Sequence, residues 1–81
     1  MKADDPRAAS YLKALGGAEN IEEIEPCTTR LRSLVHDPSK VDSPALRELG
    51  AFGVMINGRV VQVVVGPDVD VVASEINDLL N

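Results

Sequence analysis

One short segment, Cys27-Thr28-Thr29-Arg30-Leu31-Arg32, concentrates the side chains that could do chemistry. A cysteine thiolate is a nucleophile, and the planar guanidinium of arginine suits the oxygens of a phosphoryl group. If Cys27 lies at a turn, backbone N–H groups of that turn are free to point outward as a small anion-binding nest. Arg30 would then reach a group carried on the sulfur and would favour the thiolate. The segment therefore favours a cysteine that accepts and holds a phosphoryl group.

Spacing excludes several other chemistries of a reactive cysteine. Cysteine phosphatases need Cys-x5-Arg, but the sixth residue after Cys27 is Ser33. Because Cys27 is the only cysteine, Cys-x-x-Cys exchange and an internal disulfide are excluded. No glycine-rich Walker loop is present. His36 is the only histidine, and we interpret it as a surface residue; we expect no metal site and no cofactor.

The same residues also have a purely structural interpretation. A lone cysteine is most often a small buried hydrophobe, although a hairpin tip is seldom buried. Arg30 and Arg32 could be solvated or paired across the hairpin with Glu22, Glu23 or Glu25, and such pairs contribute about 0–1 kcal/mol. Three functions therefore stay open. They are a phosphoryl carrier, a regulatory module that senses phosphorylation or redox state through the cysteine, and an interaction domain with an inert cysteine.

The elements around the segment predict a hairpin with Cys27 at its tip. A first strand is expected over Ile21–Glu25, and Pro26 should end it. From Thr29 onward the residues alternate between two faces, with Leu31, Ser33 and Val35 on one and Arg30, Arg32 and Leu34 on the other. The arginines would thus share one strand face, about 7 Å apart.

Start and stop signals predict three helices and a second hairpin. One helix begins at Asp5-Pro6 and ends at Gly16-Gly17, a second begins at Ser43-Pro44 and closes at Gly50, and Asp68 caps a third. The second hairpin joins Gly53–Ile56 to Arg59–Val65, and Asn57-Gly58 suits a type I′ turn.

The resulting order, α-β-β-α-β-β-α, predicts an α+β fold. We expect a two-layer α/β sandwich in which a four-stranded antiparallel sheet carries the helices on one face. Residues 1–81 should form one domain, with residues 1–5 frayed. The other face of the sheet would be partly open to water, which would leave Val60, Gln62 and Val64 partly exposed.

Composition narrows the class of protein. The 81 residues are 44% hydrophobic and 26% charged, which argues against disorder. A net charge of -5 disfavours binding to nucleic acid. The longest apolar runs, such as Val63-Val64-Val65, are far too short to span a membrane. We expect a cytoplasmic, monomeric protein, and the initiator methionine favours a free-standing chain.

At the cysteine segment the chain resembles a known family, the enzyme IIB domain of the bacterial sugar phosphotransferase system. The branch is the one that carries glucose and N-acetylglucosamine. The resemblance extends over nearly the whole chain, through Leu15-Gly16-Gly17, Glu19-Asn20-Ile21, Ser39-Lys40-Val41-Asp42, Leu49-Gly50-Ala51-Phe52-Gly53-Val54 and Gln62-Val63-Val64-Val65-Gly66.

The resemblance implies a relay of one phosphoryl group. Cys27 would accept it from a phosphohistidine of the IIA component and pass it to a sugar bound in the membrane component IIC, at the inner face of the membrane. Arg30 and Arg32 would assist phosphate binding and transfer, and Thr29, which matches the motif threonine, would add a supporting contact. Thr28 is a phosphate-binding candidate from its place beside the cysteine, not from the resemblance. The activity would be that of a phosphotransferase acting on N-acetylglucosamine or glucose.

Overall fold

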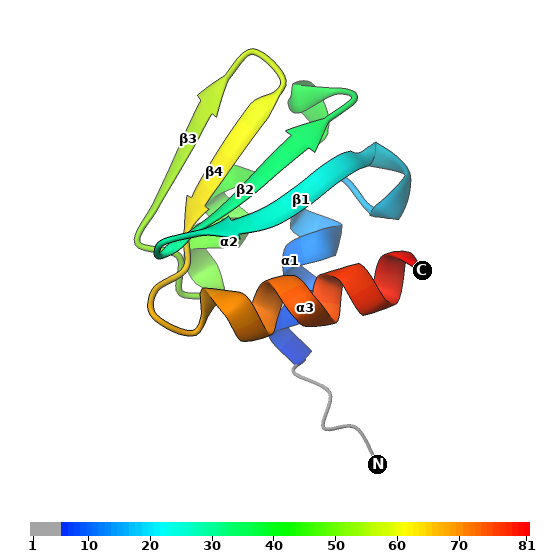
Figure 1. Cartoon of the computed structure of the whole chain (residues 1–81). Coiled ribbons are helices and arrows are strands. Elements are labelled where there is room, and N and C mark those ends of the chain that lie inside the picture. Colours follow the sequence, from blue (N-terminus) through cyan, green and yellow to red (C-terminus); the bar gives the residue numbers. More distant parts are fainter. Residues whose placement is uncertain (1–5) are drawn as a thin grey trace.

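The computed structural model describes residues 6–81 (Figure 1). Within that range the predicted order of helices and strands is confirmed, with short 3₁₀ helices at Ala18–Asn20 and Pro38–Lys40. The expected fraying of residues 1–5 and the Asp5 cap lie outside the described residues. In chain order the elements are α1 (Pro6–Ala14), β1 (Ile21–Cys27), β2 (Arg30–Val35), α2 (Ser43–Glu48), β3 (Gly53–Asn57), β4 (Val60–Val64) and α3 (Val69–Leu80).

The four strands form one antiparallel sheet in the order β1-β2-β4-β3. Each hairpin supplies one edge strand and one central strand, and the two hairpins join where β2 pairs with β4. Cys27 is the register partner of Arg30, and Arg30 in turn is the partner of Val64. Because register partners project to the same face of a sheet, this row brings the cysteine and the first arginine together.

The helices cover one face of the sheet, as Figure 1 shows, and α3 packs on β1 and β2. Alternation along β2 decides which side is covered, because Leu31, Ser33 and Val35 are buried while Arg30 and Arg32 are exposed. The covered face packs on a largely aliphatic core that includes Tyr11, Leu12, Leu15, Leu46, Val61, Val63, Val69, Val72 and Ile76. The α+β two-layer sandwich with helices on one face is therefore confirmed, and the opposite face, here called the open face, carries the half-buried Val60, Gln62 and Val64.

The prediction that Pro26 ends the first strand is wrong, because β1 continues through Pro26 to Cys27. β1 is an edge strand, and Pro26 is one residue away from the pair that closes the turn, Cys27 and Arg30. In an antiparallel ladder alternate residues direct their backbone nitrogen away from the partner strand, so a proline there removes no ladder hydrogen bond. Cys27 consequently is the last residue of β1, and Thr28-Thr29 form the tip.

The turn of the second hairpin also differs from the prediction. The two turn residues are Gly58 and Arg59, and Asn57 pairs with Val60. Only the first turn residue, Gly58, has positive φ (61°), which is the pattern of a type II′ turn and not of type I′. This register sets the apolar Ile56 opposite Val61, whereas a turn at Asn57-Gly58 would set it opposite Arg59.

Two helix N-caps differ from the prediction: the cap of α2 is one residue earlier, and the cap residue of α3 makes no side-chain hydrogen bond to the helix. The side chain of Asp42, and not of Ser43, caps α2 by accepting a hydrogen bond from the Ala45 amide at 3.1 Å. Asp68 stands at the N-cap of α3 as predicted, but its side chain makes no capping bond. Its carboxylate pairs instead with the guanidinium of Arg7 in α1, which ties the first helix to the start of the last.

Candidate functional site

Cys27 carries a free, exposed thiol at the end of β1. The next three residues, Thr28, Thr29 and Arg30, are exposed as well, so the whole tip of the hairpin is open to solvent. A buried structural cysteine is thus ruled out, and the sulfur is accessible to a partner protein. Cys27 is exposed as predicted, but it ends β1 beside the two-residue tip and does not lie on the tip itself.

The tip is a two-residue turn with an unusual backbone. Thr28 has φ 62°, and it is the one non-glycine residue with positive φ among residues 6–81. Since Thr29 does not share the positive φ, the turn has the same type II′ pattern as the turn at Gly58. Within the described part of the chain, the amides of Thr28 and Thr29 donate to no backbone carbonyl. They are therefore available to an anion beside the Cys27 sulfur.

The loop between β4 and α3 lies close to this turn and is hydrogen-bonded to it (Figure 1). The carbonyl oxygen of Thr29 accepts hydrogen bonds from the amides of Val65 and Gly66, each at 3.0 Å. Gly66 has φ 116°, a conformation that L side chains rarely adopt. These two donors are backbone groups far along the chain, and no sequence motif pointed to them.

The two arginines follow Cys27 along the open face of β2. Nη1 of Arg30 lies 3.4 Å from Oε1 of Gln62 and 3.9 Å from Sδ of Met55, so its side chain extends across the sheet. Arg32 lies one row further, between its register partners Glu25 and Gln62. Neither arginine is within ion-pair distance of a carboxylate in the described range 6–81. The alternative in which they pair with acidic residues of β1 is therefore not the arrangement observed.

Two exposed apolar side chains, Phe52 and Met55, lie on or just before β3, although no motif in the sequence indicated them. The side chain of Phe52 is 80% exposed, and its amide donates to the carbonyl of Val64, the register partner of Arg30. Met55, on the open face of β3, is 40% exposed and contacts Arg30. A large apolar residue just before Gly53, at the start of a strand, is the signal that could have revealed this surface.

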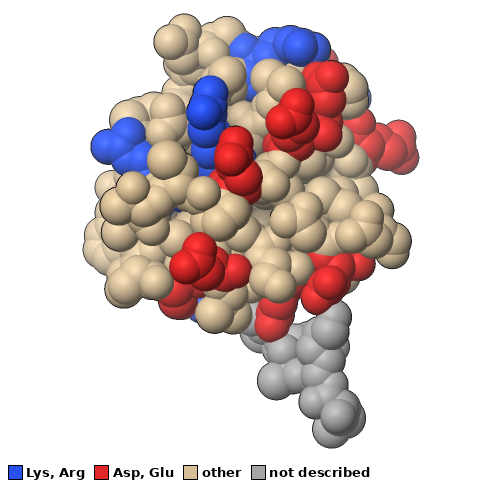
Figure 2. Space-filling model, viewed as in Figure 1, with Lys and Arg blue, Asp and Glu red and all other residues tan. Residues whose placement is uncertain are grey.

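Charge is distributed unevenly around the molecule. Figure 2 shows Lys and Arg side chains on the sheet side, at the upper left and top, and Asp and Glu side chains along β1 and α3. Arg30 and Arg32 are exposed on the open face of β2, although the net charge of the chain is -5. Near the tip, positive charge comes from Arg30, the register partner of Cys27, and from Arg32 two residues further along β2.

His36 is exposed, as predicted for a surface residue. It follows the end of β2 that lies away from the cysteine. Its Nδ1 is 3.9 Å from Oε2 of Glu22, which also pairs with Arg59 at 3.5 Å. The 6 residues of β2 separate it from the tip, a span of roughly 20 Å. At the same end, hydrogen bonds from the Ser39 hydroxyl and amide lower the pKa of Asp37. These groups therefore do not belong to the site around Cys27.

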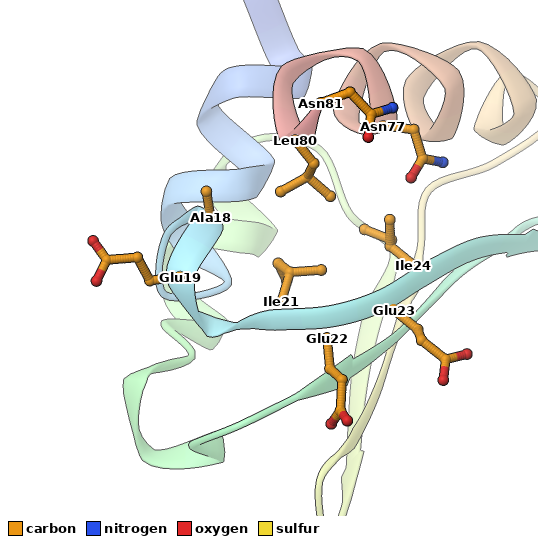
Figure 3. Close-up of a pocket in the computed structure, with 9 residues that line it drawn as sticks. All are labelled: Ala18, Glu19, Ile21, Glu22, Glu23, Ile24, Asn77, Leu80 and Asn81. Atoms are coloured by element: carbon orange, nitrogen blue, oxygen red, sulfur yellow. The ribbon is translucent and has the colours of Figure 1, made fainter.

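A hollow of about 410 Å³ lies at that far end of β1 as well. Figure 3 shows Ile21, Ile24 and Leu80 pointing into the space between β1 and the last turn of α3. Glu22 points away from this space, on the other side of the strand. The hollow contains no residue of the cysteine segment, so it is separate from the candidate site.

The arrangement of acidic, histidine and cysteine side chains bears on metal binding. Across residues 6–81, no three His, Cys, Asp or Glu side chains gather in a group that could hold a metal ion.

In the same range, none of the helices has the length and apolar character needed to cross a membrane.

Comparison with known proteins gives the class to which this fold and site belong. The sequence profile of the family described as "phosphotransferase system, EIIB" matches residues 9–42, which include the whole cysteine segment. A protein of Streptomyces coelicolor is 47% identical over 74 residues, covering 91% of this chain and 96% of the relative. The chain therefore belongs to the EIIB family of the phosphotransferase system, whose members take part in sugar phosphotransfer.

The Streptomyces relative is named the N-acetylglucosamine-specific EIIB component of its system. Among solved structures, the crystal structure of one domain of the PTS system IIabc component from Clostridium difficile superposes with a TM-score of 0.75. That domain is 24% identical, and the match covers 90% of this chain and 79% of the other. The structural match supports the fold independently of the sequence match.

Proposed function

We propose that Cys27 carries the phosphoryl group between two partners of the phosphotransferase system. The thiolate attacks the phosphorus of a phosphohistidine on the IIA component; the S–P bond forms as the N–P bond breaks, and the imidazole leaves. A hydroxyl of the sugar bound in IIC then attacks the same phosphorus. The S–P bond breaks, the thiolate is regenerated, and the hydroxyl proton is released.

The observation that carries this proposal is the row formed by Cys27 and Arg30 at an exposed turn. Phosphoryl transfer passes through a loose transition state, so it needs positioning and charge stabilisation more than a general base. Arg30 and Arg32 supply positive charge, and the amides of Thr28 and Thr29 supply neutral donors at the turn. In this proposal the hydroxyl of Thr29 adds a supporting contact.

The exposure of the tip suits a carrier that must enter two partner sites in turn. Phe52 and Met55 are exposed apolar side chains, and Met55 contacts Arg30. Such a surface fits transient complexes of modest area, in which a few apolar anchors surround the reacting group. The proposal implies a monomeric cytoplasmic protein, with residues 1–81 as one EIIB domain, that meets IIC at the inner face of the membrane.

The name of the Streptomyces relative favours N-acetylglucosamine as the sugar. Selectivity for the sugar would be determined mainly in the IIC component, because that component holds the sugar while Cys27 only delivers the phosphoryl group. We therefore propose N-acetylglucosamine ahead of glucose as the acceptor.

Intact-mass measurement of wild type and Cys27→Ser tests the first half of the relay. Each protein is incubated with phosphoenolpyruvate, the general phosphotransferase components and IIA of an N-acetylglucosamine system. We expect a mass gain of one phosphoryl group in wild type only, because serine presents a much weaker nucleophile at neutral pH. Circular dichroism should show equal folding, since Cys27 is exposed and contributes little packing. No gain in wild type with several competent donors would contradict the proposal and favour a regulatory module.

A further inference from the structure

The backbone of Thr28 is the most unusual local feature of the described chain outside its glycines. A β-branched residue at φ 62° is strained, because its Cβ crowds the neighbouring carbonyl. The second hairpin provides an unstrained comparison, since Gly58 has φ 61° at the same position of its turn. Glycine at position 28 would therefore be able to adopt this conformation without strain, among others that it can also reach.

The surroundings of Thr28 are built to maintain the strained turn. On one side Cys27 pairs with Arg30, which closes the hairpin. On the other side the Thr29 carbonyl is held by two amides, those of Val65 and Gly66, each at 3.0 Å. Strained residues that are fixed from both sides occur mostly where function requires a single arrangement.

We propose that Thr28 is a positioning residue for phosphoryl transfer, acting through its β-branched, positive-φ backbone and not through its hydroxyl. This role rests on the proposed function of Cys27. Glycine would visit many conformations at this turn, whereas a branched side chain leaves few once the anchors are in place. Thr28 therefore keeps the sulfur, the two turn amides and Arg30 in one arrangement. The cost of this fixed arrangement is the backbone strain at Thr28 in the folded protein.

Stability and activity should respond in opposite directions at this position. Thr28→Gly removes the strain, so its melting temperature should be equal to or above that of wild type. Its single-turnover rate of phosphoryl acceptance from phosphorylated IIA should fall by about tenfold or more, since small misplacements of reacting groups slow transfer strongly. The IIA concentration at half-saturation should change little, because the substitution removes one small side chain and leaves Arg30, Phe52 and Met55 in place.

Two further variants separate the backbone effect from a role of the hydroxyl and from strain in general. Thr28→Val keeps the branched shape and lacks the hydroxyl, so it should transfer several-fold faster than Thr28→Gly. Gly58→Thr places the same strain in the second hairpin, at the end of the sheet away from Cys27. That variant should lose thermal stability and keep the wild-type transfer rate.

The experiment measures melting temperature and single-turnover transfer for wild type and these three variants with the same phosphorylated IIA. A Thr28→Gly protein that transfers at the wild-type rate would overturn the proposed role. A Thr28→Val protein as slow as Thr28→Gly would also overturn it, because the hydroxyl would then be the active group. Equal slowing in Gly58→Thr would overturn it too, since any strained hairpin would then slow transfer. If wild type itself gains no phosphoryl group, the proposed function fails, and the role of Thr28 falls with it.

Discussion

The two arginines of the open face differ in their distance from the sulfur. Arg30 stands directly across from Cys27, whereas Arg32 is two residues further along β2, about 7 Å away. Both side chains lack a carboxylate partner within residues 6–81, so their charge is available to an anion. A phosphoryl group on the sulfur would therefore lie closer to Arg30 than to Arg32.

We predict that Arg30→Gln and Arg32→Gln slow transfer to the sugar more than acceptance from IIA. The expected loss in the sugar step is on the order of 100-fold, as for the removal of one charge-stabilising donor from a transition state. Arg59→Gln is the matched control, because Arg59 is an exposed arginine that pairs with Glu22 at the far end of the sheet. The two half-reactions are measured separately by mass and by sugar phosphate formed. Equal losses in both would contradict these roles.

Among the elements, the loop between β4 and α3 matters most for the site. It supplies both donors to the Thr29 carbonyl, and Asp68, two residues after Gly66, is tied to α1 through Arg7. The exposed turn is thus connected to the helical layer although it lies at the edge of the sheet. This connection explains how a two-residue tip can be held in a strained form.

Gly66→Ala should disturb this connection. A residue other than glycine at φ 116° is strained, and we expect a loss of about 1–3 kcal/mol in the free energy of unfolding, measured with urea. Phosphoryl acceptance should slow as well, because the loop can relieve the strain by moving away from Thr29. The control is Gly50→Ala, with φ 106° and open space around its Cβ position at the end of α2. That variant should lose stability alone; a similar slowing there would argue against a specific role for the loop.

For the molecule as a whole, sequence patterns predicted the features that are determined by residues close together in the chain, namely the helices and the two faces of the sheet. Alternation of Leu31, Ser33 and Val35 with the arginines identified the covered and open faces correctly, and helical spacing identified the three helices. Strand order is a long-range property, so the tolerance of Pro26 in an edge strand could not be foreseen. Nor could the strain at Thr28, because threonine gives no local signal for positive φ. The hydrogen bonds from the Val65 and Gly66 amides to the Thr29 carbonyl involve backbone atoms only, so the side-chain types could not predict them.

The net charge of the chain and the charge of the site have opposite signs and act over different distances. A net charge of -5 would repel an anionic partner at long range, while Arg30 and Arg32 attract the phosphoryl group at short range. Each half of the relay must therefore be tested with its own partner, since each partner contributes its own surface to the encounter.

The most direct test of the relay follows one phosphoryl group through the protein. The chain is phosphorylated, separated from IIA, and mixed with vesicles that contain IIC of an N-acetylglucosamine system and the sugar. We predict that the mass gain disappears from the chain as N-acetylglucosamine phosphate appears in equal amount, and that peptide mapping before discharge locates the group on Cys27. A phosphorylated chain that keeps its phosphoryl group under these conditions, or that carries it elsewhere than on Cys27, would contradict the relay.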